Sequence, residues 1–363
     1  MKQGIIYRSE GSLFNYIGWP TVAKDENGVI YVVASGHRLG HVCPFGKNYM
    51  FKSYDNAKTW EGPIIINDTL YDDRDAGILP LGDGKMILSW FINNIDVYTS
   101  RYDRITKYAD ESVVSLWKAG IELWESVPED KRLCGSYVKI TEDGGKTWSQ
   151  PIIVPISSPH GPTKLKNGKL LYLGTEFESK QRPGNTDNES SIVAYESDDE
   201  GLTWKKLGHV PLVKNNPNIF MCEPHQIELD DGSILGMIRV HEDPDSHKFC
   251  TYQSISKDGG VTWSDPVFIG EGSPPHVLRH SSGALVLTYT IRSKDYGQRA
   301  RVSYDEGKTW SDEIVLCTNA VNWDSGYCSS TELDDGSIYT VYYQKADGDK
   351  YCSLMYTNWN LPK

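Results

Sequence analysis

Apolar residues recur along this chain in short runs, each preceded by a tight turn, and the arrangement appears six times. Every turn is a dipeptide ending in glycine, followed by β-forming residues such as VIYVVAS or SIYTVYY. Asn-Gly and Asp-Gly between such runs are the strongest short hairpin signal. The pattern therefore predicts six β-hairpins, which turn at Asn27-Gly28, Asp83-Gly84, Asn167-Gly168, Asp231-Gly232, Ser282-Gly283 and Asp335-Gly336.

A second repeat, with the consensus SxDxGxTW, is offset from these hairpins. Its Asp can accept hydrogen bonds from its own turn, its Gly can take a positive φ, and its Trp can fold back as a largely buried plug. Units that recur every 40 to 50 residues or so indicate a solenoid or propeller. The five copies are SYDNAKTW (Ser53 to Trp60), TEDGGKTW (Thr141 to Trp148), SDDEGLTW (Ser197 to Trp204), SKDGGVTW (Ser256 to Trp263) and SYDEGKTW (Ser303 to Trp310).

These copies resemble the Asp box of the sialidase superfamily, in which the motif closes the hairpin between the third and fourth strands of a propeller blade. The resemblance implies an all-β fold, a six-bladed β-propeller of four-stranded antiparallel blades, with the boxes away from the functional site. The last unit has no box, and we expect residues 3 to 8 to complete its blade. An ordinary sandwich with five surface hairpins is the structural alternative.

One segment interrupts the rhythm. About 40 extra residues, 94–135, lie between the second hairpin and its Asp box. Insertions of this length map to loops on a blade face. The segment could cap the pocket, pair two subunits in a homo-oligomer, or be a surface excursion. Its apolar residues have helical spacing, at Val113, Leu116, Trp117, Ile121 and Trp124.

Composition limits the function classes. The repeats run almost end to end through 363 residues, so we expect a single domain, 1–363. A net charge of −12 without a basic run argues against nucleic acid as a partner. No apolar stretch is long enough to span a membrane, the N-terminus lacks a signal-peptide core, and seven cysteines lack paired spacing, so a cytoplasmic location is the default expectation. P-loop, HExxH and CxxC motifs are absent, and no cofactor is expected.

Functional residues are expected where the innermost strands begin, because these strands converge on the central channel of a propeller. Polar, titratable residues recur at equivalent places there: His160, His225 and His276 in blades three to five, Asp75 in blade two and Tyr327 in blade six. Three histidines in register indicate a functional site at the end of the central channel where the innermost strands begin, which we call the mouth. They could bind sugar through hydrogen bonds or hold Zn²⁺, and we favour the sugar and expect no metal.

Within the resemblance, three segments match catalytic parts of the superfamily. MCEPHQIELDDGSILGMIRV is similar to its fourth-blade segment, which implies roles for Glu223 and Arg239, and DSGYCSSTELDDGSIYTVYY is similar to the segment of its nucleophilic Tyr, which implies Tyr327. Arg292 looks like the third member of its arginine triad, with Arg299 and Arg301 as competitors. A carboxylate beside an anomeric carbon repels an anionic nucleophile, so a neutral Tyr activated by a Glu suits such a sugar.

The chain departs from the superfamily in blade one. Its first strand reads Tyr16-Ile17-Gly18-Trp19-Pro20 in place of an Arg-Ile-Pro motif, and the loop that should carry the acid Asp has none. That loop holds His37, Arg38 and His41 instead. We expect Arg38 or Arg74 to supply the missing positive charge, and Asp75, Asp73 or a histidine to supply the acid. Trp19, Tyr16 and Trp323 could stack on sugar rings or pack between blades.

The sequence therefore predicts an exo-acting glycoside hydrolase that removes a terminal acidic sugar, a sialic acid or a uronic acid, from a glycan. Two alternatives stay open: a propeller lyase that acts on a uronate, and a glycan-binding propeller without catalysis. The predicted catalytic residues are Tyr327, Glu223 and Asp75, and the predicted substrate-binding residues are Arg38, Arg74, Arg239, Arg292, His37, His160, His225 and His276.

Overall fold

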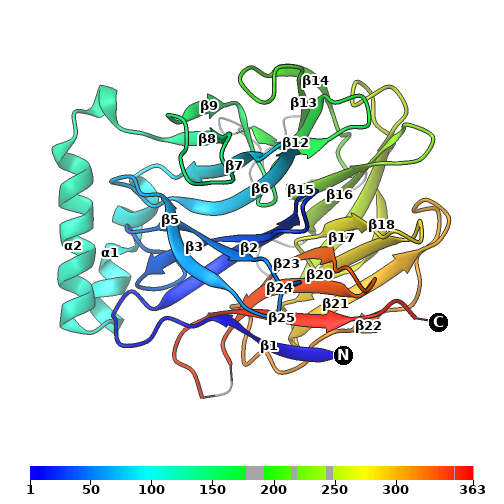
Figure 1. Ribbon diagram of the computed structural model, residues 1–363. Helices are drawn as coiled ribbons and strands as arrows, with labels where there is room; N and C mark the ends of the chain where they lie inside the picture. The colour runs from blue at the N-terminus through cyan, green and yellow to red at the C-terminus, as the bar shows by residue number, and fades with distance from the viewer. Residues whose placement is uncertain (177–191, 214–218, 243–247, 347, 363) are drawn as a thin grey trace.

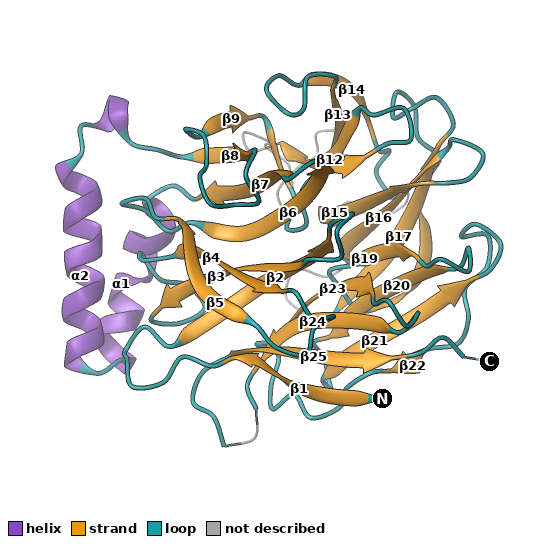
Figure 2. Cartoon of the chain, viewed as in Figure 1, coloured by secondary structure: helices purple, strands orange, loops and turns teal. Residues whose placement is uncertain are grey.

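The computed structural model describes residues 1–176, 192–213, 219–242, 248–346 and 348–362. Their strands form six antiparallel sheets, which follow one another along the chain as the blades of a propeller (Figure 1). Five sheets have four strands, and in the third the innermost strand is split into two short pieces. Figure 2 shows that helices occupy only one side of this mainly β structure. The predicted six-bladed β-propeller is confirmed.

The first three blades take up the N-terminal half of the chain. Blade one comprises β2 (Tyr16–Lys24), β3 (Ile30–Arg38), β4 (Lys47–Ser53) and β5 (Glu61–Asn67). Blade two comprises β6 (Arg74–Gly82), β7 (Lys85–Ile92), β8 (Gly135–Thr141) and β9 (Ile152–Val154). Blade three comprises β10 (Ile156–Ser157), β11 (Thr163–Lys164), β12 (Leu170–Glu176), β13 (Ile192–Ser197) and β14 (Lys205–His209).

The remaining blades complete the ring. Blade four comprises β15 (Phe220–Glu228), β16 (Ile234–His241), β17 (Phe249–Ser256) and β18 (Val267–Glu271). Blade five comprises β19 (His276–Arg279), β20 (Leu285–Ile291), β21 (Gly297–Ser303) and β22 (Ile314–Val315). Blade six comprises β23 (Gly326–Glu332), β24 (Ile338–Gln344), β25 (Ser353–Trp359) and β1 (Lys2–Tyr7).

The N-terminal strand β1 closes the ring by pairing antiparallel with β25, from Lys2 opposite Asn358 to Tyr7 opposite Leu354. Figure 1 shows this strand beside the C-terminal part of the chain. The pairing covers the edge that blade six would otherwise expose to another chain. The expected completion of the last blade by the first residues is therefore confirmed.

Both predicted turn repeats occur where their sequences place them. The six glycine turns join the first and second strands of each blade, and their glycines have φ between 75° and 89°, where a side chain would be strained. The five Asp boxes join the third and fourth strands. In the first, Asp55 accepts hydrogen bonds from the backbone N–H of Lys58 at 3.1 Å and of Thr59 at 2.9 Å. Trp263 is buried, and the other four box tryptophans are partly buried and packed against the apolar clusters of the blades, as expected for largely buried plugs.

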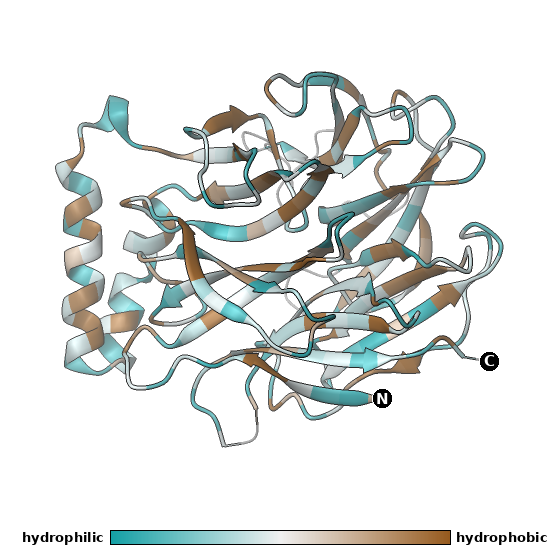
Figure 3. Ribbon diagram, viewed as in Figure 1, coloured by the Kyte–Doolittle hydropathy of each residue, from teal (hydrophilic) through white to brown (hydrophobic). Residues whose placement is uncertain are grey.

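The insertion after β7 forms two helices, α1 (Asp96–Tyr108) and α2 (Glu111–Ser126), followed by the short helix η1 (Glu129–Lys131). Apolar residues recur along α2 in Figure 3, as its periodicity predicted. Helix α1 also lies within the 94–135 insertion that was expected to be helical, although its polar sequence DVYTSRYDRITKY carries few apolar positions and shows no clear periodicity of its own. Among the described residues, no helix has both the length and the apolar content that a membrane span requires.

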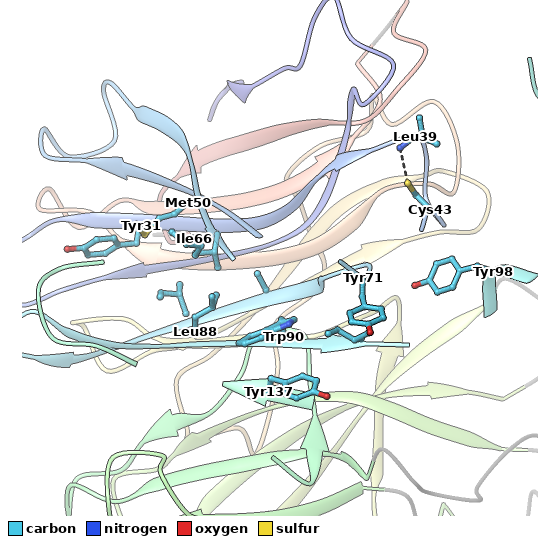
Figure 4. Packing of buried hydrophobic residues seen from close by; sticks show 14 of the residues in the cluster. Tyr31, Leu39, Cys43, Met50, Ile66, Tyr71, Leu88, Trp90, Tyr98 and Tyr137 are labelled. Atoms are coloured by element: carbon cyan, nitrogen blue, oxygen red, sulfur yellow. Dashed lines mark hydrogen bonds between the residues drawn. The ribbon is translucent and has the colours of Figure 1, made fainter. Parts of the chain in front are cut away.

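The helices are attached to blades one and two by buried aromatic side chains. Tyr98, Trp117 and Trp124 belong to the same apolar cluster as Tyr71 and Trp90, part of which Figure 4 shows from close by. Trp124 Nε1 donates a hydrogen bond to the Leu70 carbonyl at 3.1 Å. Burying aromatic rings contributes a few kcal/mol each, so this side of the insertion is part of the core.

Candidate active site

Four innermost strands carry the same irregularity close to their start. The ladder register shifts between Gly18 and Thr21 in β2, Arg74 and Gly77 in β6, Cys222 and His225 in β15, and Gly326 and Ser329 in β23. Within each bulge one side-chain-bearing residue has a left-handed φ: Trp19 at 56°, Asp75 at 49°, Glu223 at 46° and Tyr327 at 54°. Such conformations cost about 1–3 kcal/mol each and cluster at functional sites. The same kind of bulge, with one left-handed residue, thus places four chemically different side chains near the start of four strands.

Tyr327 and Glu223 meet directly, although 104 positions separate them in the sequence. The Tyr327 hydroxyl donates a hydrogen bond to Glu223 Oε1 at 2.7 Å. Arg239 Nη1 forms an ion pair with Glu223 Oε2 and lies 3.4 Å from the Tyr327 hydroxyl oxygen. The phenol, the carboxylate and the guanidinium therefore form one cluster between blades four and six.

The electrostatics of this cluster give Glu223 and Tyr327 opposite protonation states. Burial would raise the pKa of Glu223, but Arg239 and the hydrogen bond from Tyr327 bring it below its usual value. Burial and the negative charge of Glu223 raise the pKa of Tyr327 well above its ordinary range. At neutral pH the pair is a carboxylate beside a protonated phenol, which is the arrangement in which a base can take the phenolic proton.

Three guanidiniums surround the phenol. Arg239 bonds to it, the Arg292 guanidinium carbon lies 5.2 Å from the centre of its ring, and Arg74 stacks at 4.3 Å over Trp19, whose ring centre is 6.4 Å from that of Tyr327. Burial would lower the pKa of all three arginines, but nearby acidic groups, Tyr327 among them, raise it. Three arginines therefore lie around Tyr327, and two of them are paired within the site, Arg239 with Glu223 and Arg74 with Asp72.

Asp75 is the third bulge residue with acid–base chemistry. Its side chain is almost completely buried, Oδ1 makes no hydrogen bond among the described residues, and Arg74 Nε is 3.8 Å away. Burial raises the pKa of Asp75 to about 7, although Arg74 opposes the shift, and the nearby charge of Glu223 adds to it. A carboxyl group with such a pKa is partly protonated near neutral pH, as a general acid requires.

Arg38 and Asp73 are tied into the joint between blades one and two. Arg38 is 0 % exposed and makes two hydrogen bonds to Asp72, which also accepts one from Tyr98. Asp73 accepts hydrogen bonds from the backbone and the hydroxyl of Thr69, both at 2.9 Å. A role for Arg38 in contacting substrate, or for Asp73 as the acid, stays a prediction, and these partners favour a structural role for both.

The three histidines predicted in register do lie together, as a cluster of their own. Ring centres are 4.3 Å apart for His225 and His276, 5.0 Å for His160 and His276, and 5.5 Å for His160 and His225. His225 Nδ1 accepts the backbone N–H of Val277, and His160 Nδ1 is 3.1 Å from the Thr21 hydroxyl, so the cluster connects different blades. Burial lowers the pKa of all three. Within the described part of the chain, no group of three or more His, Cys, Asp or Glu residues is arranged to hold a metal ion.

Two histidines of blade one, His37 at the end of β3 and His41 in the loop after it, have different surroundings. His37 stacks on Phe14 at 4.1 Å between ring centres, whereas His41 Nδ1 lies 2.8 Å from Asp324 Oδ1 and 3.0 Å from the Tyr16 hydroxyl. The His41 ring also contacts Trp19, at 5.1 Å between ring centres. His41 thus adjoins the mouth and His37 packs elsewhere. Tyr16 and Trp19 are buried between blades, and Trp323 is 39 % exposed.

Arg299 and Arg301, the other candidates for the third arginine, lie on β21 and have hydrogen-bond partners of their own. Arg299 bonds to Glu313 at 2.9 Å and to the Cys317 carbonyl at 2.8 Å, and Arg301 bonds to the Ser311 carbonyl at 2.7 Å. Arg292 instead donates to the Ser325 carbonyl at 2.8 Å and to the Tyr343 hydroxyl at 3.1 Å, beside Tyr327. Sequence reasoning assigned no role to Asp324 and Tyr343, which begin and end the segment DSGYCSSTELDDGSIYTVYY, because the resemblance singled out only Tyr327 there.

A cavity of about 650 Å³ also lies between the outer strands of blades two and three. Its acidic residue Glu176 is already paired with Lys206 at 2.7 Å and accepts a hydrogen bond from Tyr195 at 2.9 Å. Since no innermost strand lines it, it is remote from the bulge residues in the fold. The cluster around Tyr327 is therefore the better candidate for chemistry.

Comparison with known proteins connects this geometry with a family. The BNR repeat-like domain family matches residues 177–351. A sialidase of Bacteroides fragilis is 23 % identical over 325 residues, which cover 80 % of this chain and 53 % of that protein. The chain therefore spans about half the length of this curated relative.

Solved structures share the fold over almost the whole chain. A protein of unknown function from Dyadobacter fermentans has a TM-score of 0.76 and 23 % identity, covering 99 % of this chain and 98 % of its own. The NanB sialidase of Streptococcus pneumoniae has a TM-score of 0.66 and 16 % identity, covering 99 % of this chain and 70 % of its own. Similarity at these identities shows a common propeller architecture.

Proposed function

Because this chain is a six-bladed BNR-repeat propeller of the sialidase superfamily, we propose that it is an exo-acting glycoside hydrolase that removes a terminal acidic sugar, a sialic acid or a uronic acid, from a glycan. The observation that carries the proposal is the hydrogen bond of 2.7 Å from Tyr327 to Glu223 inside a ring of guanidiniums. A carboxylate paired with a buried phenol can take the phenolic proton during catalysis. The propeller fold alone does not indicate such a role.

The arginines account for the acidic sugar. Arg74, Arg239 and Arg292 come from blades two, four and five and lie on different sides of Tyr327. Guanidinium groups bind carboxylates with two parallel hydrogen bonds, each worth about 1.5–3 kcal/mol when charged. We propose that Arg74 takes the place of the arginine missing from blade one. A neutral sugar would offer these guanidiniums no anionic group beyond the partners that Arg239 and Arg74 already have in Glu223 and Asp72.

In the first step Tyr327 is the nucleophile. Glu223 takes the phenolic proton while the phenolate oxygen bonds to the anomeric carbon, and the bond from that carbon to the leaving oxygen breaks. The leaving oxygen keeps the bonding electron pair and receives a proton from Asp75. A phenol that is neutral before attack avoids the repulsion that a carboxylate nucleophile would meet from the sugar carboxylate.

In the second step water replaces the protein. Asp75, now ionised, takes a proton from water as its oxygen bonds to the anomeric carbon, and the carbon–phenolate bond breaks. Glu223 returns the proton to the Tyr327 oxygen, so both residues regain their starting states. Two displacements at one carbon retain its configuration.

The two alternatives fit the contacts less well. A lyase that used Tyr327 with a histidine would need the imidazole to exchange a proton with the phenol, whereas the hydroxyl of Tyr327 donates to Glu223. A propeller that only binds glycans has no need for a buried carboxyl of raised pKa beside a strained tyrosine. Hydrolysis uses all of these features.

The test is a substrate panel. Purified protein is incubated with aryl sialosides, aryl uronides and neutral aryl glycosides, with absorbance of unsaturated uronate followed in parallel. We expect release of the aryl group from an acidic glycoside only, with the configuration of the freed sugar retained by NMR. Unsaturated product would establish the lyase, and binding of acidic sugars without release of the aryl group would establish the binding propeller.

A further inference from the structure

A groove of about 620 Å³ separates helix α1 from the ring. One wall is the blade-one loop at Leu39 to Val42, another is α1, and blade six contributes Trp323, Lys350 and Tyr351. The volume lies within the range of sites for small molecules. Helix α2 contributes Val113 and Trp117 to the lining, so the groove is bounded on one side by the apolar cluster that attaches the insertion to the blades.

Positive charge dominates the groove. Arg101 and Arg104 lie one turn apart on α1, and Lys350 stands on the blade-six side. Among the described residues that line the groove, Asp110 is the only acid, and it lies 3.9 Å from Lys350. A local excess of two cations in a chain of net charge −12 is unexpected unless it attracts an anion.

The groove and the mouth share a wall. His41 lines the groove, and the same side chain contacts Trp19 and bonds to Asp324 in the mouth. Trp323, whose ring centre is 5.4 Å from that of His41, belongs to the segment that leads into β23 and Tyr327. His41 and Trp323 thus stand between the groove and the strand that carries Tyr327.

We propose that this groove binds the leaving-group side of the substrate and selects a sugar that carries a carboxylate or a sulfate. Arg101, Arg104 and Lys350 supply the charge, and Trp323 offers an apolar ring to the sugar face. The inference rests on the proposed function, because it assumes that a glycan occupies the mouth. It adds a second anionic position, so the favoured substrate carries two negative charges.

The experiment measures binding without turnover. In the Tyr327→Phe background, isothermal titration calorimetry compares three probes: sialyllactose with its neutral leaving group, the same compound sulfated on galactose, and a sialic acid dimer. We expect one or both charged probes to bind at least about fivefold more tightly than sialyllactose. Which one binds more tightly identifies the source of the anion. Higher salt should weaken the preference, because the groove is open to solvent.

The Arg101→Ala/Arg104→Ala variant should lose this preference and keep its affinity for sialyllactose. The matched control is Lys118→Ala/Lys131→Ala, which removes the same charge from exposed parts of the insertion that do not line the groove. Equal binding of charged and neutral probes before these changes, or a preference that survives the arginine variant, would overturn the groove assignment. A wild-type protein that hydrolyses none of the probes while the preference holds would overturn hydrolysis alone, and no binding of any probe would overturn both.

Discussion

The mouth and the Asp boxes both repeat one backbone feature around the ring, but they differ in the side chains placed on it. Every box uses the same Asp with the same partners, and its Oδ2 accepts the threonine hydroxyl at 2.6 Å in all five copies. The four mouth bulges carry Trp19, Asp75, Glu223 and Tyr327 instead. Where both backbone and side chain repeat, the feature serves the fold. Where only the backbone repeats, the side chains are available for chemistry.

The two regions also differ in how their polar groups are satisfied. Asp55 lies at the surface with its oxygens bonded within its own turn, and these hydrogen bonds, led by that of Thr59, lower its pKa to about 2. Asp75 is buried with one oxygen unbonded, and burial raises its pKa to about 7. A carboxylate whose oxygens accept hydrogen bonds from the local backbone stabilises a turn. A buried carboxyl group that lacks such bonds is a candidate for a functional role.

The largest expected effect is a loss of catalysis at the mouth, without a change at the Asp boxes. Tyr327→Phe removes only the nucleophilic oxygen, so kcat on the acidic glycoside should fall at least about 1000-fold while ligand affinity changes little. Glu223→Gln should cost nearly as much, and the double variant little more, because the two residues act as a unit. Steady-state kinetics and calorimetry measure both quantities.

A matched control removes a phenol outside the cluster. Tyr289→Phe deletes a hydroxyl that bonds to Glu313 at 3.0 Å on the outer side of blade five. It should keep nearly normal turnover. Near-normal activity of Tyr327→Phe would exclude Tyr327 as the nucleophile and direct attention to His41 and the histidine cluster.

The next effect is on stability, and it belongs to the boxes. Trp263 is buried, and its Nε1 donates to the Gly260 carbonyl at 3.0 Å, so Trp263→Ala should lower the free energy of unfolding by about 3–5 kcal/mol. The half-buried Trp60 should cost clearly less when replaced by Ala. Urea denaturation measures both. Loss of turnover in a folded Trp263→Ala protein would contradict the separation of boxes from chemistry.

These two regions also show what sequence can predict. The conformation of a glycine turn or an Asp box is determined by its own residues, because those that hydrogen-bond to one another lie within four positions. The periodicity of α2 is equally local. The bulges have no such signal, since Trp, Asp, Glu and Tyr share no property that fixes a left-handed φ. The register of the repeats located Asp75 and Tyr327, whereas Glu223 and the nucleophilic role of Tyr327 came only from the resemblance.

Other parts of the site depend on contacts between distant segments. His41 and Asp324 are 283 positions apart, and Arg74 is placed over Trp19 by the packing of blade two on blade one. Sequence reasoning offered Arg38 and Arg74 equally for the missing charge. In the structure both guanidiniums lie over Trp19 and both pair with Asp72. Arg38 is fully buried and makes two hydrogen bonds to Asp72, whereas Arg74 makes one, at 3.4 Å, and also lies beside Asp75. Helix α1, whose sequence is mostly polar, is likewise held by the packing of Tyr98.

The third prediction uses pH to separate the two aspartates. The pKa of Asp75 is raised to about 7, so the folded protein binds this proton more tightly than the unfolded chain, and Asp75 lowers stability as pH rises from about 4 to 7. Asp75→Asn should flatten that loss. The pKa of Asp55 is lowered to about 2, so its contribution is present above about pH 4 and is lost as pH falls through about 2.

Unfolding free energies of the wild type, Asp75→Asn and Asp55→Asn, measured from pH 3 to pH 8 or so, give the two slopes directly. The difference between wild type and Asp75→Asn should grow between about pH 4 and 7, and the difference for Asp55→Asn should shrink below about pH 4. A constant difference between wild type and Asp75→Asn across this range would mean that Asp75 keeps an ordinary pKa and is unsuited to act as the acid at neutral pH.

The smallest effect tests the idea that strain serves function only in the mouth. The first box has Ala57 where the other four have glycine, and Ala57 has a φ of 62°. A left-handed alanine costs about 1–2 kcal/mol, and glycine gives back part of that through the entropy of the unfolded chain, so Ala57→Gly should stabilise the protein by about 0.5–1 kcal/mol. Denaturation by urea measures the gain, and turnover should not change.

Gly326→Ala, at a φ of 134° next to Tyr327, is the opposite substitution. Its added Cβ would lie 3.1 Å from Arg292 Nη2, so it should reduce both stability and turnover. If Ala57→Gly instead destabilised the protein or altered its turnover, strain at the boxes would have a role beyond the turn, and the contrast between the two regions would fail.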